Sequence, residues 1–338
     1  MRVKAPYFWI WLCKTHGIGP KKLASIAKIL HEHQRQPETL PLNPTELLAQ
    51  FPKLANILNG RIRVEDSQAI YTEYLSLKDA GITMLHPSHP NFPQHLLEIS
   101  PILFIKGQPR LLASDGVAIV GARDVSEEGI RVAQTIGAAL AREGINVVSG
   151  YAKGVDSEAH FSALAADGTT TIVLPHGITG LRRKKAFRNF NWERNVLAVS
   201  QFAPDAKCLA RNAMARNELI CALSKAVVVI ESAPERNALG KMSGTFNTGK
   251  TALEMNLPLF VVDPAFFQEP PQGNTDLIRL GGHKLNPRNG VRDILRYLKV
   301  TPFDEPNRSV NKAKDKSYIQ MNLLAEFQVS TEHSVTGS

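Results

Sequence analysis

Small and basic residues follow two apolar runs of this chain, in an arrangement suited to binding a phosphate. Gly121 and Arg123 come directly after the run at 117–120, and Gly150 and Lys153 come after the next run. Glycine lets backbone N–H groups approach a phosphate closely, while Arg and Lys side chains supply positive charge. These residue types in this order therefore predict a phosphate-binding site.

The densest positive charge of the chain lies a little further on, in segment 180–195. It holds six basic residues against one acid, with Phe187, Phe190 and Trp192 between them. Basic groups follow a phosphate backbone and aromatic faces stack on unpaired bases, so this mixture favours single-stranded nucleic acid. The alternative is a solvated loop whose aromatic side chains pack on the protein.

A third segment imitates a nucleotide-binding motif. Residues 244–251 match the Gly-x-x-x-x-Gly-Lys-Thr string of phosphate loops, and 257–263 resembles a strand that ends in an aspartate. A true phosphate loop follows its strand directly, whereas residues 233–243 separate this segment from the preceding apolar run. We therefore expect the start of a helix that can attract an anion, rather than an ATPase.

The remaining polar residues suggest binding more than catalysis. Arg216 and Asn217 stand near the start of an apolar helical stretch, and Asp156 is placed either to cap a helix or to join the site. His160 and His176 are expected near the same edge, where histidines more often pack or cap than catalyse. The sequence holds no catalytic triad and no metal-ligand spacing, so we expect no catalytic residue, no metal and no cofactor.

Composition sets the class of protein. The chain has 338 residues, of which 43% are hydrophobic, enough for two domains or for one large domain with a small appendage. Its net charge of +9 favours an anionic partner, nucleic acid above all. Three widely spaced cysteines indicate reduced thiols in a cytoplasmic protein, and the apolar run at 7–13 is too short to cross a membrane.

Alternating apolar and helical patterns must place these residues. Helices are expected at 126–143, 155–167, 211–223 and 248–256, and strands within 101–107, 117–123, 145–150, 170–177, 196–200, 226–232 and 257–263. Strands joined in this way by helices form an α/β fold with a mostly parallel sheet. Its loops meet at the carboxyl edge of the strands, which is where such sheets bind ligands.

The part of the chain before the sheet reads as a small helical module, 1–85. Helices near 7–15 and 21–30 flank the turn at 16–20, and a second pair is expected near 44–58 and 65–80. A helix–hairpin–helix (SAM-like) arrangement of this kind either holds a nucleic-acid backbone or simply joins two helices. A connector with an entry strand (86–116), the α/β domain (117–299) and a polar basic tail (300–338) complete the predicted organisation.

Taken in order, these segments resemble the DNA-processing protein A family (DprA, also called Smf). The resemblance spans about residues 8–285 and depends on the ordered series of motifs, because any single motif is weak. After the helical module, the matching segments are 92–97, 101–107, 117–123, 149–156, 159–160, 170–177, 200–204, 216–220, 243–245 and 273–279.

The resemblance implies a Rossmann-like doubly wound domain that binds single-stranded DNA without catalysis or sequence preference. It further implies a homodimer that protects single strands in natural transformation or recombination and helps to load a RecA-type recombinase. Together with the basic segment, the expected DNA-binding residues are Gly121, Arg123, Ser149, Gly150, Lys153, Gly154, Asp156, Arg182, Arg183, Lys184, Lys185, Arg188, Arg216, Asn217, Ser243 and Thr245.

The chain also departs from the family pattern. Ala122 replaces the usual serine, segment 182–192 replaces a Tyr-Pro-x-x-Asn stretch, and residues 300–338 are too few and too polar for the winged-helix module of many members. These differences indicate a divergent branch. Two alternatives are a nucleotide-sensing module and a nucleoside-monophosphate phosphoribohydrolase; the second needs a glutamate that is missing between 243 and 253.

Overall fold

The computed structural model describes residues 5–35, 49–58 and 67–298. Within these residues, nine strands form one sheet in the order β1-β2-β6-β5-β4-β3-β7-β8-β9. The strands are β1 (Ile82–Leu85), β2 (Leu103–Gly107), β3 (Gly116–Val120), β4 (Asn146–Ser149), β5 (Thr170–Val173), β6 (Val196–Ser200), β7 (Ala226–Val229), β8 (Leu259–Val262) and β9 (His283–Leu285). All neighbouring pairs from β6 to β9 are parallel, whereas β1 and β2 are antiparallel additions. The predicted α/β fold with a mostly parallel sheet is confirmed.

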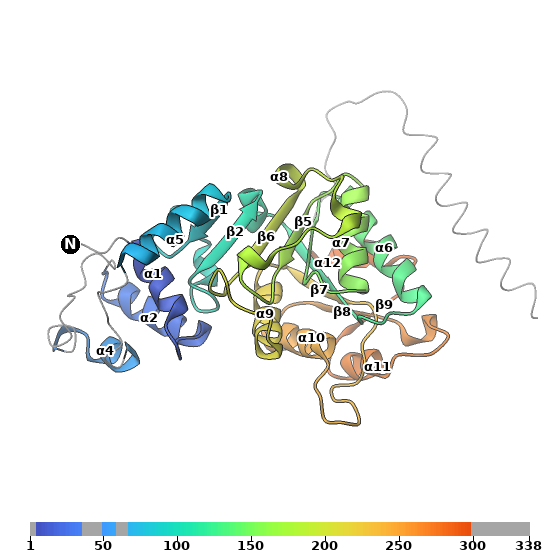
Figure 1. Cartoon of the computed structure of the whole chain (residues 1–338). Helices are drawn as coiled ribbons and strands as arrows, with labels where there is room; N and C mark the ends of the chain where they lie inside the picture. Colours follow the sequence, from blue (N-terminus) through green and yellow to red (C-terminus); the bar gives the residue numbers. More distant parts are fainter. Residues whose placement is uncertain (1–4, 36–48, 59–66, 299–338) are drawn as a thin grey trace, which may run out of the picture. The chain divides into compact units, whose positions relative to one another are not determined.

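Helices cover both faces of this sheet, which makes it doubly wound (Figure 1). One face packs against α6 (Glu127–Arg142), α7 (Val155–Ala165) and α12 (Gly290–Leu298), and the other against α9 (Ala210–Ala222), α10 (Gly244–Glu254) and α11 (Gln272–Arg279). Alternation along β3 explains the two layers: Val117 and Ile119 point to the first group of helices, and Ala118 and Val120 to the second. A shorter helix, α8 (Trp192–Asn195), leads into β6.

The N-terminal helices are α1 (Ala5–Lys14), α2 (Pro20–Glu32), α4 (Pro52–Leu58) and α5 (Ser67–Asp79). The turn between α1 and α2 fits its sequence, because Gly17 adopts φ +79° and Pro20 occupies the first position of α2. The helices predicted at 7–15 and 21–30 are confirmed as α1 and α2. Parts of the second predicted helix pair, 44–48 and 65–66, and the predicted tail 300–338 lie outside the described residues.

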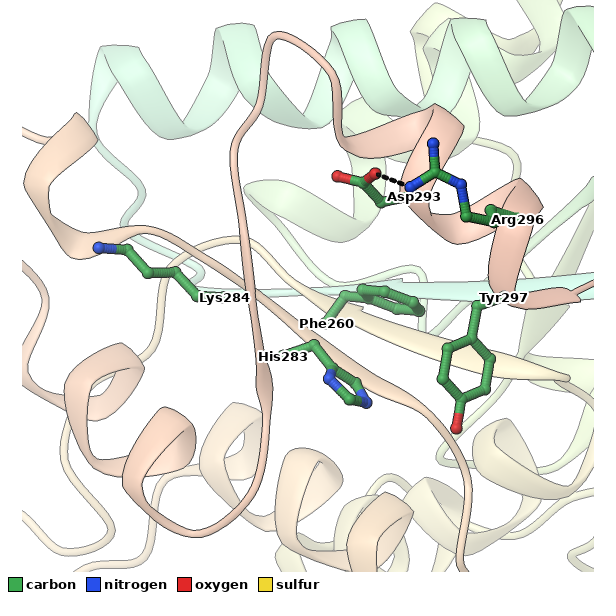
Figure 2. A pocket seen from close by; sticks show the side chains of 6 residues that line it. All are labelled: Phe260, His283, Lys284, Asp293, Arg296 and Tyr297. Atoms are coloured by element: carbon green, nitrogen blue, oxygen red, sulfur yellow. Dashed lines mark ion pairs between the residues drawn. The ribbon is translucent and has the colours of Figure 1, made fainter.

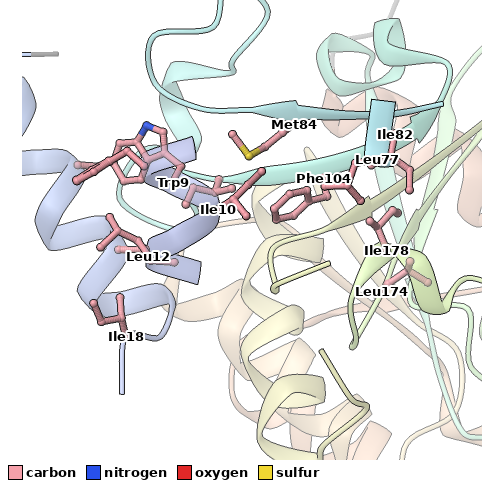
Figure 3. Packing of buried hydrophobic residues seen from close by; sticks show 14 of the residues in the cluster. Trp9, Ile10, Leu12, Ile18, Leu77, Ile82, Met84, Phe104, Leu174 and Ile178 are labelled. Atoms are coloured by element: carbon pink, nitrogen blue, oxygen red, sulfur yellow. The ribbon is translucent and has the colours of Figure 1, made fainter. Parts of the chain in front are cut away.

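These helices and the sheet share one hydrophobic cluster (Figure 3). Trp9, Ile10 and Leu12 of α1 are buried in the same cluster as Phe104 of β2 and Ile178 beyond β5. Residues 82–85 were assigned to the helical module, but they form the outer strand β1 and pair with β2. A short apolar stretch directly after a helix carries no periodicity of its own, and only its pairing partner reveals it as a strand. The N-terminal helices and the sheet thus share one core. The boundaries drawn between the sequence modules remain a prediction.

Candidate nucleic-acid interface

The first predicted turn lies between β3 and α6, and the start of α7 packs directly against it. A Cβ atom added to Gly121 would lie 2.4 Å from a methyl carbon of Val155, so glycine is needed for this close packing. The N–H of Ala122 donates to Glu231 O (2.8 Å), and the N–H of Val155 donates to Ala122 O (3.2 Å). Arg123 is exposed and makes no hydrogen bond or ion pair with any described residue. Its guanidinium is therefore available to a ligand.

The second turn, residues 150–154, folds tightly onto the first. Gly154 has φ +78°, and an added Cβ would lie 2.4 Å from Ala122 O and 2.5 Å from Arg123 O. Tyr151 has φ +60°, a left-handed conformation that large side chains rarely adopt. The two turns consequently form one surface at the carboxyl edge of β3 and β4, as the sequence predicted.

A weak ion pair joins the tips of the two turns. Lys153 Nζ lies 2.8 Å from Asp124 Oδ1, with 79% and 91% of the side chains exposed. The hydrogen bond from Lys153, together with its charge, lowers the pKa of Asp124. Because exposed pairs contribute little stability, a phosphate can take the place of Asp124 at Lys153.

Arg216 supplies a positive charge below this surface. It is 6% exposed, and its Nη1 donates to Val173 O at 2.9 Å. A Cβ added to Gly150 would lie 1.6 Å from Nη1, so the missing side chain of Gly150 makes room for the guanidinium. Arg216 Nε is buried and has no hydrogen-bond partner among the described residues. Arg216 is thus placed beneath the second turn, as a buried support of the edge.

Ser149 and Asp156 are also buried and support the turns from within. The Ser149 hydroxyl donates to Ile119 O at 2.6 Å, which ties β4 to β3. The Asp156 carboxylate accepts the N–H of Ala152 at 3.2 Å, in the turn before α7, whereas the start of α7 has no side-chain cap, so Asp156 supports the turn and does not cap the helix. Burial raises the pKa of Asp156, and the nearby charge of Arg216 opposes this rise.

The start of α10 contacts α9, and α10 follows β7, the neighbour of β3 in the sheet. Ser243 Oγ caps the helix by accepting the N–H of Phe246 at 3.3 Å, and Thr245 lies in its first turn. Asn217 Nδ2 donates to Gly244 O (3.2 Å), which links α9 to this helix start. Residues 244–251 all belong to α10 and form no loop before a helix, so the match to the phosphate-loop string is a coincidence of sequence.

Two aromatic side chains of the basic segment, expected to stack on bases, are buried in the protein. Phe187 and Trp192 are 2% and 5% exposed, and Trp192 Nε1 donates to Phe187 O at 3.0 Å. They cannot stack on bases because they are packed inside the protein, together with Tyr151 and Phe190. The alternative, aromatic side chains that dock on the protein, is the one observed for Phe187 and Trp192.

The basic side chains of this segment differ in direction. Arg182, Arg183, Lys185 and Arg188 are exposed, and the Arg183 guanidinium carbon lies 4.7 Å from the centroid of the Trp192 ring. Lys184 instead contacts the second turn through its ammonium group. Arg194 is exposed as well, so five of the six cations of the segment reach solvent, although Arg182 Nη1 also donates to Thr179 O and Leu181 O. The sixth cation, Lys184, is engaged by the protein.

Both histidines expected at the edge make contacts within the protein. His160 is fully buried with its Nδ1 2.6 Å from Thr170 Oγ1, and His176 Nδ1 lies 2.9 Å from Gly177 O. Burial lowers the pKa of His160 to about 3. Among the described residues, no cluster of three or more His, Cys, Asp or Glu side chains could hold a metal ion.

A separate hollow lies at the β9 end of the sheet (Figure 2). It has a volume of about 410 Å³ and is lined by residues of β8, β9 and α12, namely Phe260, His283, Lys284, Asp293, Arg296 and Tyr297. None of the predicted site residues lines it.

In the part of the chain that the structure describes, no helix is both long and apolar enough to span a bilayer.

Comparison with known proteins yields consistent matches. Residues 81–299 match the family model described as DNA recombination-mediator protein A. The chain is 28% identical over 314 residues to protein Smf of Synechocystis sp., covering 88% of this chain and 73% of that protein. It is 33% identical over 197 residues to protein Smf of Escherichia coli, covering 58% of this chain and about half, 51%, of the relative.

Solved structures show the same fold. The X-ray structure of DNA processing protein A from Streptococcus pneumoniae aligns with a TM-score of 0.65 at 23% identity, over 87% of this chain and 98% of that one. DNA processing protein A from Helicobacter pylori aligns with a TM-score of 0.52 at 25% identity, over 64% of this chain and 96% of that one. The latter structure is described as giving insight into a single-stranded DNA binding mode.

Proposed function

This chain belongs to the DNA recombination-mediator protein A family, and we propose that it binds single-stranded DNA at the edge formed by its first two turns, without catalysing a reaction. The observation that carries the proposal is the combination of exposed Arg123 and Lys153 with the buried cation Arg216 beneath them. The similarity to the Helicobacter pylori protein supports a single strand as the ligand.

The two turns suit the phosphate backbone rather than the bases. The N–H groups of Lys153 and Gly154 have no acceptor among the described residues, and they precede α7. Backbone N–H groups at a helix start bind phosphates, and such contacts carry no sequence information. We therefore propose that Arg123, Lys153 and these N–H groups contact phosphates, and that Ser243 and Thr245 extend the contact along α10.

The exposed cations of the basic segment form the flank of this proposed site. Arg182, Arg183, Lys185 and Arg188 follow strand β5, the neighbour of β4, and so lie next along the same carboxyl edge. They would neutralise phosphates beyond the two turns, which makes binding steeply dependent on salt. The proposal extends, on family grounds, to a homodimer that protects single strands and assists a RecA-type recombinase.

Fluorescence anisotropy of a labelled single strand and of its duplex, across a salt series, tests the proposal. We expect the single strand to bind much more tightly than the duplex. Arg123→Ala and Lys153→Ala should each weaken binding about tenfold, since a hydrogen bond to a charged group contributes roughly 1.5 kcal/mol or more. The matched control is Arg142→Ala, which removes an exposed cation at the opposite end of α6.

Two outcomes would contradict the proposal. If Arg123→Ala and Lys153→Ala bind as well as Arg142→Ala does, the site lies elsewhere. If a mononucleotide binds saturably while the oligonucleotide does not bind even at low salt, the two turns serve the nucleotide-sensing alternative.

A further inference from the structure

The ammonium group of Lys184 points into the protein. Its Nζ donates to Tyr151 O (2.9 Å), Ala152 O (3.1 Å) and Ser157 Oγ (2.6 Å). An ammonium group has three N–H donors, and here each has an acceptor. Lys184 therefore has no donor left for a phosphate, unlike its exposed neighbour Lys185.

Lys184 and Tyr151 are joined by further contacts. Nζ lies 4.3 Å from the centroid of the Tyr151 ring, and the Lys184 N–H donates to Tyr151 Oη at 3.0 Å. The Tyr151 hydroxyl in turn donates to Arg182 O at 3.4 Å. The ring also packs edge-on against His160 and Phe187. These contacts hold Tyr151 in its left-handed backbone conformation, which is unfavourable unless its surroundings enforce it.

The bonds to Lys184 fix the direction of the N–H groups in the second turn. In a planar trans peptide the C=O and the following N–H point in opposite directions. Because Ala152 O points to Lys184, the N–H of Lys153 must point away from it. The N–H of Ala152 already donates to the Asp156 carboxylate at 3.2 Å. The N–H of Lys153 is free, and Lys184 orients it indirectly, through its hydrogen bond to Ala152 O.

The charge around Lys184 is consistent with an internal role. The carboxylates of Asp156 and Glu158 favour its protonated form, while burial lowers its pKa. The Ser157 hydroxyl, which accepts from Nζ, also donates to Ala152 O. Lys184 is thus one member of a closed hydrogen-bond network beneath the turn.

We propose that Lys184 is a positioning residue, which locks the peptide groups of turn 150–154 into the orientation that binds phosphate and makes no contact with DNA itself. This inference rests on the proposed function. It divides the basic segment into an internal clasp, Lys184 with Tyr151, and an outer row of cations that meets the ligand.

The salt dependence of DNA binding separates the two roles. Each cation that contacts a phosphate contributes about 0.7 to the slope of log affinity against log salt for a single strand. We expect Lys185→Met to lower this slope by about that amount. Lys184→Met, which keeps the apolar stem, should weaken binding about tenfold or more with the slope unchanged. A slope lowered as in Lys185→Met, or an unchanged affinity, would overturn the proposal.

Tyr151→Phe gives an independent test without changing any charge. It removes the hydroxyl that joins Lys184 N to Arg182 O, and it also serves if Lys184→Met fails to fold. We expect severalfold weaker binding with the wild-type slope. Wild-type affinity in this variant would show that the clasp does not control the turn.

Amide hydrogen exchange of the full chain without DNA separates this inference from the proposed function. Peptides that cover 150–157 should exchange faster in Lys184→Met than in Lys185→Met, because only the former opens the network. Equal exchange in both variants would overturn the clasp. If the wild-type protein fails to bind a single strand while the exchange differs as expected, the proposed function fails and the clasp stands.

Discussion

His160 shows how strongly burial changes a single residue. Thr170 Oγ1 donates to Val147 O at 2.6 Å, so it accepts from His160, which places the proton of the neutral imidazole on Nδ1. The other nitrogen, Nε2, is buried and has no partner among the described residues. The positive charges of Lys184 and Arg216 add to the effect of burial and lower the pKa of His160 to about 3.

This shift makes the folded state sensitive to acid. The unfolded chain takes up a proton on this imidazole below its ordinary pKa of about 6.5, whereas the folded protein resists until about pH 3. The contribution is therefore fully present above about pH 6.5 and is lost as the pH falls. Between about pH 7 and about pH 5 the free energy of unfolding should decrease by about 2 kcal/mol through His160 alone.

Urea unfolding at both pH values measures this effect by comparison with a variant. His160→Asn keeps an N–H donor near Thr170 but does not titrate, so its loss of stability over this interval should be smaller by about 2 kcal/mol. An equal pH dependence in both proteins would mean that His160 is protonated in the folded state.

At the same scale, the sequence predicts which residues gather at the edge, but it does not predict which of them reach solvent. Lys184 and Lys185 are adjacent and chemically identical, yet one is enclosed by backbone carbonyls and the other is exposed. Ser149, Asp156 and Arg216 were correctly expected at the carboxyl edge, although each lies beneath it. Direction depends on long-range packing, which residue type and spacing do not encode.

The turn at Gly154 is the element that joins the two halves of the proposed site. Its φ of +78° suits glycine, and an added Cβ would collide with the backbone oxygens of Ala122 and Arg123. Backbone atoms cannot move aside as a side-chain end can, so Gly154→Ala must shift the first turn. We expect a loss of about 2–3 kcal/mol in the free energy of unfolding, together with weaker DNA binding.

Chemical unfolding of Gly154→Ala beside Gly244→Ala checks this expectation. A Cβ added to Gly244, at the start of α10, meets no atom within 4 Å. Gly244→Ala should accordingly leave the stability nearly unchanged or slightly increased, because alanine favours the helix. Similar losses in both variants would argue against a special constraint at Gly154.

Elements with strong periodicity were predictable, and those defined by a distant partner were not. The predicted helix at 126–143 corresponds to α6, because its apolar spacing specifies both a helix and its buried side. The predicted strand at 196–200 corresponds to β6, a short apolar run that is buried on both faces. The edge strand β1 was missed and counted with the helical module, since only its pairing with β2 reveals it as a strand. Phe187 and Trp192 were expected to meet DNA for a related reason: the partners that bury them lie elsewhere in the sequence.

For the molecule as a whole, the shared core makes the N-terminal helices part of the same cooperative structure as the sheet. Leu12 of α1 is completely buried in the cluster that also contains Ile82, Phe104 and Leu174 (Figure 3). Trp9, Trp11 and Trp192 all belong to this cluster or pack against it, so tryptophan fluorescence reports on it directly.

Leu12→Ala therefore tests whether the predicted helical module unfolds independently. The substitution leaves a cavity in a buried cluster, which should lower the free energy of unfolding by about 2–5 kcal/mol. Since the cluster continues into the sheet, we expect thermal transitions followed by fluorescence and by far-ultraviolet circular dichroism to shift together to lower temperature. Two separated transitions, with the main circular dichroism change left at the wild-type temperature, would instead show that the helices fold as a separate unit. A joint shift would mean that the proposed edge inherits its stability from a core that extends into α1, far along the chain from its own turns.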